Sequence, residues 1–154
     1  GGGPGRADPG AKAAGAAAAA AFGLEKLLHT DCAALSQGQR QLVQLARAMV
    51  QSAPVLLLDE PGSALDFSNT HRLFRLLRDR LAEGGRCAVA VLHDPALALR
   101  DCSPVLLLRE GRVVGRLEPG RCTDAEAQAA LARLYPGIRV KADKETGHWL
   151  CTIE

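Results

Sequence analysis

The chain has 154 residues, a hydrophobic fraction of 47% and a formal net charge of +2, values typical of one globular domain with its own core. The charge is too nearly balanced to indicate a polyanionic partner, and an aromatic fraction of 3% argues against a base-stacking surface, so we expect no nucleic-acid partner. No apolar run approaches the ~20 residues that cross a bilayer, and the chain start lacks the regions of a signal peptide, so we expect no direct membrane insertion.

The first residues are dominated by Gly, Pro and Ala. We expect residues 1–15 to form a disordered leader, because they bury too little apolar area to offset the entropy of ordering, and a domain to span residues 16–154. Residues 5–12 have two glycines at the spacing of a phosphate-binding P-loop. The lysine that follows is one position late and no Ser or Thr comes next, so a flexible leader is the better interpretation. The chain starts without Met, which favours a fragment or a processed protein.

An S-x-x-Q capping box, formed by Ser36 and Gln39, predicts the start of a helix. Apolar residues follow at helical spacing, at Leu42, Val43, Leu45, Ala46, Met49 and Val50. The unpaired amides and the macrodipole at a helix start favour anions, so this position is a candidate anion site. On its own, an ordinary helix cap would be the commoner explanation.

Two apolar runs with chemically active ends follow. Residues 55–58 are typical of a parallel strand covered on both faces, and they lead into Asp59 and Glu60. Residues 88–92 predict a second buried strand, which leads into His93. Ligands collect at the carboxyl edge of such sheets, although a solvated acidic pair and a structural histidine are the plain alternatives.

The intervening and remaining elements complete the expected order. We expect helices at residues 66–82, 95–99 and 124–134, strands at 104–108 and 113–117 joined by a turn, and a terminal hairpin from 138–140 and 149–153. Asp66 could cap the first of these helices, Thr123 caps the last, and Trp149 reads as a small core anchor. Strands that alternate with helices predict an α/β fold with a mainly parallel sheet.

Five cysteines, an odd number with no C-x-x-C pair, indicate a reducing compartment rather than a disulfide framework or a metal site. We therefore expect a cytoplasmic protein, whose link to any membrane is peripheral.

The order of the motifs resembles the ATP-binding cassette (ABC) family of ATPases. Its signature motif, Walker B motif, D-loop and switch histidine correspond to Leu35-Ser36-Gln37-Gly38-Gln39, residues 55–61, residues 63–66 and His93. The resemblance covers residues 24–118. In that family the P-loop lies about a hundred residues before the signature, and only 34 residues precede Leu35 here. The resemblance therefore implies an incomplete P-loop NTPase fold that lacks the P-loop portion, and a chain that is inactive alone.

The resemblance also implies roles for the signature and D-loop residues. Ser36, Gln37, Gly38 and Gln39 would bind the γ-phosphate of ATP held by a second subunit, and Gln37 replaces a glycine that is usual in the family. Asp66 would link the two nucleotide sites of the dimer.

At the strand ends, the resemblance implies that Asp59 holds the Mg²⁺ shell. Glu60 would orient or deprotonate the attacking water. His93 would contact the γ-phosphate and that same water.

The implied activity is hydrolysis of ATP to ADP and phosphate, with Mg²⁺, in a head-to-tail dimer of ABC subunits bound to a transmembrane permease at the inner face of the cell membrane. Residues 63–69 and 92–98 look most like importers of metal chelates such as iron-siderophore, haem, cobalamin or molybdate. Two alternatives remain: a non-catalytic fragment that acts as an interaction module, and an ABC ATPase outside transport. The Gln39 ending of the signature argues against relatives in DNA repair.

Overall fold

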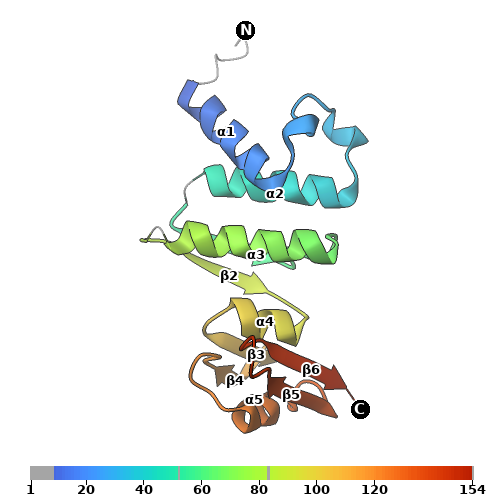
Figure 1. Cartoon of the computed structure of the whole chain (residues 1–154), viewed down its shortest axis with the longest axis vertical. Helices are drawn as coiled ribbons and strands as arrows, with labels where there is room; N and C mark the ends of the chain where they lie inside the picture. The colour runs from blue at the N-terminus through green and yellow to red at the C-terminus, as the bar shows by residue number, and fades with distance from the viewer. Residues whose placement is uncertain (1–8, 52, 83, 154) are drawn as a thin grey trace. The chain divides into compact units, whose positions relative to one another are not determined.

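The computed structural model describes residues 9–51, 53–82 and 84–153 and has the expected α/β class (Figure 1). Its contacts divide the chain into two compact units, one that extends to Val91 and one that begins at Leu92. The first unit contains α1 (Pro9–Phe22), η1 (Glu25–Leu27), η2 (Cys32–Ala34), α2 (Gln37–Val50), β1 (Val55–Asp59), α3 (Phe67–Ala82) and β2 (Cys87–Val91). The second contains α4 (Pro95–Asp101), β3 (Val105–Arg109), β4 (Arg112–Leu117), α5 (Asp124–Leu131), β5 (Ile138–Ala142) and β6 (Trp149–Ile153). Within the described ranges, no helix is long and apolar enough to span a bilayer.

Helix α1 begins seven residues before residue 16, where we expected the domain to start. It starts at Pro9, where the fixed φ of proline suits the first helical turn, so residues 9–15 of the expected disordered leader are helical. Residues 1–8, which include half of the P-loop-like segment, lie outside the described part of the chain. The helix ends at Phe22 and is followed by Gly23, whose φ of 70° is left-handed. The N–H groups of Gly23 and Leu24 donate to the oxygens of Ala20 and Ala19, at 3.0 and 2.8 Å, as in a Schellman motif.

The parallel pair β1–β2 places its two strand ends at one edge, with Asp59 beside Val91. Burial alternates along β1: Leu56 and Leu58 are 8% exposed, whereas Leu57 is 79% exposed. The expectation that residues 55–58 are covered on both faces is therefore wrong, because the described residues cover one face of this two-stranded sheet. The second strand is not fully buried either, since Val89 and Val91 are exposed. Among the strands of the described ranges, β1–β2 is the one parallel pair, while β3–β4 and β5–β6 are antiparallel.

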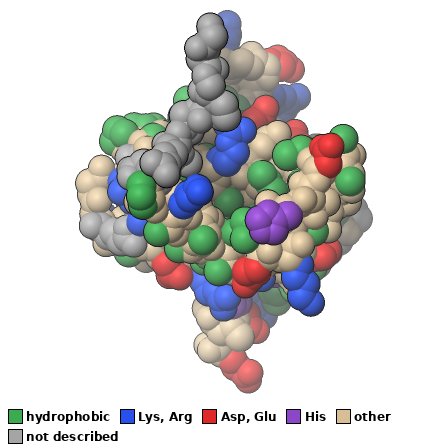
Figure 2. Space-filling model, turned by 90° about the horizontal axis from the view of Figure 1, so that it is seen from above, with side chains coloured by type: hydrophobic (Ala, Val, Ile, Leu, Met, Phe, Trp, Pro, Cys, Tyr) green, Lys and Arg blue, Asp and Glu red, His purple; other side chains and the backbone are tan. Residues whose placement is uncertain are grey.

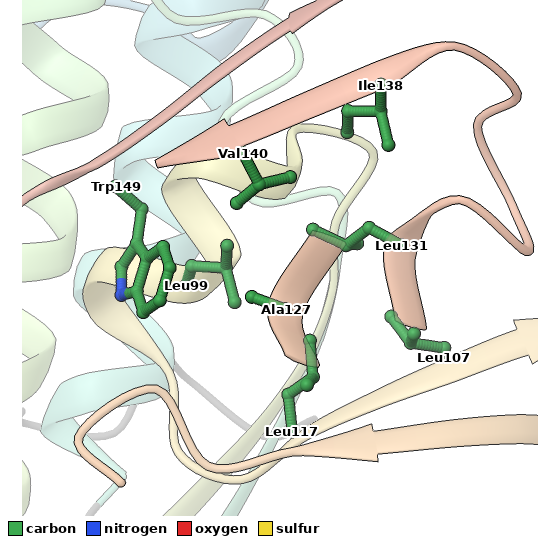
Figure 3. Close-up of a cluster of buried hydrophobic side chains, with 8 residues drawn as sticks. All are labelled: Leu99, Leu107, Leu117, Ala127, Leu131, Ile138, Val140 and Trp149. Atoms are coloured by element: carbon green, nitrogen blue, oxygen red, sulfur yellow. The ribbon is translucent and has the colours of Figure 1, made fainter. Parts of the chain in front are cut away.

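The second unit has a core to which all six of its elements contribute. Figure 3 shows the buried side chains pointing toward one another: Leu99, Leu107, Leu117, Ala127, Leu131, Ile138, Val140 and Trp149. Both predicted hairpins are confirmed, and Trp149 is the core anchor that the sequence indicated. The predicted Thr123 cap is confirmed as a capping box with Glu126, although α5 ends at Leu131. Hydrogen bonds from the Thr123 N–H and hydroxyl lower the pKa of the Glu126 carboxyl below its usual range.

We expect Leu58→Ala to lower the free energy of unfolding by about 2–4 kcal/mol, since it removes a buried side chain and leaves a cavity. Leu57→Ala, the same change one residue earlier on the open face, should cost less than about 1 kcal/mol. Urea denaturation of the two variants measures the difference. Equal losses would show that the two faces of β1 are buried alike.

Candidate functional site

The start of α2 is built by a reciprocal capping box, as predicted. The Gln39 N–H donates to Ser36 Oγ at 3.2 Å, and the Ser36 N–H donates to Gln39 Oε1 at 2.9 Å. Leu35, only 5% exposed, anchors the chain just before the cap. Ser36 and Gln37 are exposed, so the helix start faces solvent while its apolar side packs inward.

Gly38 lies against the turn that follows β1. A Cβ at Gly38 would be 2.7 Å from the Ala64 carbonyl oxygen, which is shorter than real Cβ contacts allow. A glycine is therefore required here by the close approach of two backbones, whatever its role toward a ligand.

A second contact joins the same helix to the same turn. The side-chain amide of Gln41 donates from Nε2 to the Glu60 carbonyl oxygen at 3.0 Å. Its Oε1 accepts from the Ala64 N–H at 3.2 Å. Sequence reasoning missed Gln41, although it lies four residues before buried Leu45 and so on the inward side of α2.

The carboxylates Asp59 and Glu60 lie where β1 ends, as predicted. Asp59 is exposed and is the last residue of the strand. Glu60 has a φ of 43°, a left-handed conformation that is uncommon for a residue other than glycine. The Glu60 N–H donates to the Val91 oxygen at 3.1 Å, and its carbonyl oxygen also accepts from the Ser63 N–H at 3.1 Å.

Asp66 directly precedes α3, and its carboxylate hydrogen-bonds within the first turn of that helix. Its Oδ1 accepts from the Asn69 N–H at 2.8 Å and its Oδ2 from Asn69 Nδ2 at 3.0 Å. The predicted capping role is confirmed. The residue remains exposed, so a second contact with a partner is sterically open.

His93 belongs to the second unit, two residues beyond the end of β2. Its side chain is exposed, and its carbonyl oxygen accepts from the Tyr135 hydroxyl at 3.1 Å. Asp94 follows and caps α4 by accepting from the Ala96 and Leu97 N–H groups, at 2.9 and 3.1 Å. The first unit thus carries all the predicted site residues except His93.

The carboxylates at the end of β1 suit a metal ion that is also bound by a nucleotide, rather than a metal ion held by protein side chains alone. No group of three or more His, Cys, Asp or Glu that could hold a metal occurs in the described ranges. Mg²⁺ commonly takes one or two carboxylates and completes its shell with phosphate oxygens and water, so the exposed carboxylate of Asp59 fits it when a nucleotide is bound.

A separate pocket of about 400 Å³ lies between α1, residues 24–35 and α2. It is lined mainly by small and apolar side chains and by none of the predicted site residues. Figure 2 shows hydrophobic side chains around a hollow on the face that it draws. The pocket is thus distinct from the polar site at the start of α2.

Comparisons with known proteins find similarity to ATP-binding proteins of ABC transporters. The sequence model of a family described as "ABC transporter" matches residues 10–63. The hemin import ATP-binding protein HmuV of Streptomyces coelicolor is 45% identical over 102 residues, which cover 66% of this chain and 35% of that relative. The cobalamin import ATP-binding protein BtuD of Halobacterium salinarum is 43% identical over 96 residues, which cover 62% and 24%.

A solved metal-chelate type ABC transporter in an inward-facing conformation superposes with a TM-score of 0.70 and 26% sequence identity, over 95% of this chain and 57% of that one. The chain spans only about a quarter to a third of the two import relatives.

We expect Gly38→Ala to destabilise the chain, because the added methyl group would collide with the Ala64 carbonyl. Gly15→Ala is the matched control: it is also helical, its Cβ would meet nothing within 4 Å, and it should stabilise the chain by up to about 1 kcal/mol. Thermal unfolding of the two variants checks the opposite signs. A Gly38→Ala chain as stable as Gly15→Ala would show that α2 and the turn do not touch.

Proposed function

We propose that this chain, which carries part of the ATP-binding domain of an ABC transporter, supplies the signature helix and the water-activating carboxylate of an ATPase subunit. The observation that carries the proposal is the direct contact between α2 and the turn after β1. One rigid unit thereby holds a helix start that faces solvent and the carboxylates Asp59 and Glu60.

The start of α2 suits the γ-phosphate of an ATP molecule held by a second subunit. The capping box uses the amides of Ser36 and Gln39, and the Arg40 N–H bonds to the Ser36 oxygen. The amides of Gln37 and Gly38 then remain to face an anion at the positive end of the helix dipole. Ser36 Oγ accepts a hydrogen bond in the cap, so its own proton is available for a phosphate oxygen.

At the end of β1, Glu60 would orient or deprotonate the water that attacks the γ-phosphate. Asp59 would hold Mg²⁺, which neutralises charge on the phosphate oxygens when it is bound. His93 would contact the γ-phosphate and the same water. Asp66 would reach across the dimer from its place at the start of α3.

In this proposal, the loop that cradles the phosphates is supplied by polypeptide outside these 154 residues, because they contain no G-x-x-x-x-G-K-[ST] motif. The subunit works as a head-to-tail dimer, in which each signature helix serves the ATP bound by its partner. By analogy with the hemin and cobalamin import relatives, the dimer lies at the inner face of the cell membrane. There it drives a transmembrane permease that imports a metal chelate or similar solute.

The test joins this chain to the polypeptide that precedes the matched region in the Streptomyces hemin relative, which supplies the P-loop. In this joined chain, Glu60→Gln should lower kcat on the order of 100-fold and leave ATP affinity nearly unchanged, because the carboxylate acts on water in the transition state. Steady-state kinetics beside an ATP-binding titration measure both quantities.

Glu110→Gln is the matched control, since Glu110 also has a positive φ and follows a strand, but its side chain is 86% exposed in a hairpin turn. It should leave kcat unchanged. If Glu60→Gln strongly weakened ATP binding and left the turnover per bound ATP unchanged, Glu60 would be a structural residue. An unmutated joined chain that bound ATP without hydrolysis would favour the interaction-module alternative.

A further inference from the structure

Gln41 is a half-buried polar residue on a helix whose neighbouring inward positions are apolar. Leu42, Leu45 and Ala46 are all at most 7% exposed. In contrast, the side-chain nitrogen and oxygen of Gln41 both form hydrogen bonds with the turn after β1. A half-buried amide is stable only when its donor and acceptor are both satisfied. Here the two partners are backbone groups four residues apart, on Glu60 and Ala64.

The conformation of Glu60 needs such support. A left-handed residue with a Cβ costs about 1–2 kcal/mol, so the surroundings must hold it in place. The Glu60 N–H is held by the Val91 oxygen of β2, and its carbonyl oxygen is held by Gln41 and by Ser63. Because both backbone polar groups of Glu60 are fixed, the direction of its Cα–Cβ bond is fixed as well.

The Ala64 peptide lies between two residues of α2. Its N–H donates to Gln41, and its carbonyl oxygen lies so close to Gly38 that a Cβ would come within 2.7 Å. Gly38 and Gln41 are one helical turn apart and therefore face the same way. The helix start that faces the phosphate and the turn that aims the carboxylate thus move as one body.

We infer that Gln41 is a positioning residue: its side-chain amide ties the signature helix to the turn after β1 and thereby sets the direction of the Glu60 carboxylate. The inference rests on the proposed function. Glutamine suits the role because one neutral side chain must both donate to a carbonyl and accept from an N–H. Glutamate at this position could only accept, and methionine, of similar length, would do neither well.

The first test uses the 154-residue chain alone and follows the Ala64 amide by hydrogen exchange in NMR spectra. Gln41→Met should speed this exchange on the order of 10-fold, because its hydrogen bond is lost. Gln41→Glu keeps the acceptor and should preserve the protection. Gln44→Met, on the exposed side of α2, is the matched control and should change nothing.

The second test uses the joined chain. Both Gln41→Met and Gln41→Glu lose the donor to Glu60 and should lower kcat on the order of 10- to 100-fold, with the KM for ATP within about twofold of the unmutated value. If Gln41 had only a structural role, its substitutions would lower the unfolding midpoint but would not lower kcat at a nearly unchanged KM. The Gln41→Glu variant decides the question if Gln41→Met does not fold.

Unchanged kcat in Gln41→Glu, or unchanged Ala64 exchange in a folded Gln41→Met chain, would overturn the inference and leave the proposed function standing. If the unmutated joined chain failed to hydrolyse ATP, the proposed function would fall, and this inference with it.

Discussion

The close contact between the first turn of α2 and the turn after β1 is the constraint on which the candidate site depends. The contact needs a residue without a side chain at position 38, which Gly38 supplies. It also needs a side-chain amide that both donates and accepts a hydrogen bond, which Gln41 supplies. Because the backbones meet here, an anion at the helix start and a water molecule near Glu60 would belong to one rigid arrangement. The contact is local to the first unit, and β2 supports it through the bond from Glu60 to Val91.

Several features of this arrangement follow from short-range chemistry and could be predicted. Ser36 and Gln39 satisfy each other's amides within four residues, so the start of α2 was readable from the sequence. The end of the first strand at Asp59 and the hairpin turn at Glu110 and Gly111 could also be predicted, because residues adjacent in the sequence determine them. The α/β class and the ABC resemblance, which the comparisons confirm, rest on the order of these local signals.

The rest depends on contacts between distant segments. The apolar run in β1 predicts a hydrophobic strand, but it does not say which face of the strand other residues cover. Leu57 lies on the face that the described residues leave open and is therefore exposed. A left-handed Glu60 has no sequence signal, because glycine and asparagine usually mark that conformation. Gln41 looks like any surface glutamine of a helix until the turn that it binds is placed beside it. Residues 9–15 are helical although Pro9, Gly10 and Gly15 favoured a flexible leader, because the other four residues, Ala11, Lys12, Ala13 and Ala14, are strong helix formers.

The central claim is that this chain carries a preassembled signature helix and catalytic carboxylate, whereas the loop that cradles the phosphates is supplied elsewhere. In P-loop ATPases most phosphate contacts come from that loop. Titration of a fluorescent ATP analogue against the 154-residue chain is the most direct measurement, with the joined chain as reference. The account predicts no submicromolar binding by the chain alone and at least about tenfold tighter binding by the joined chain. Submicromolar affinity of the chain alone would contradict it, because a complete phosphate site would then lie within these 154 residues.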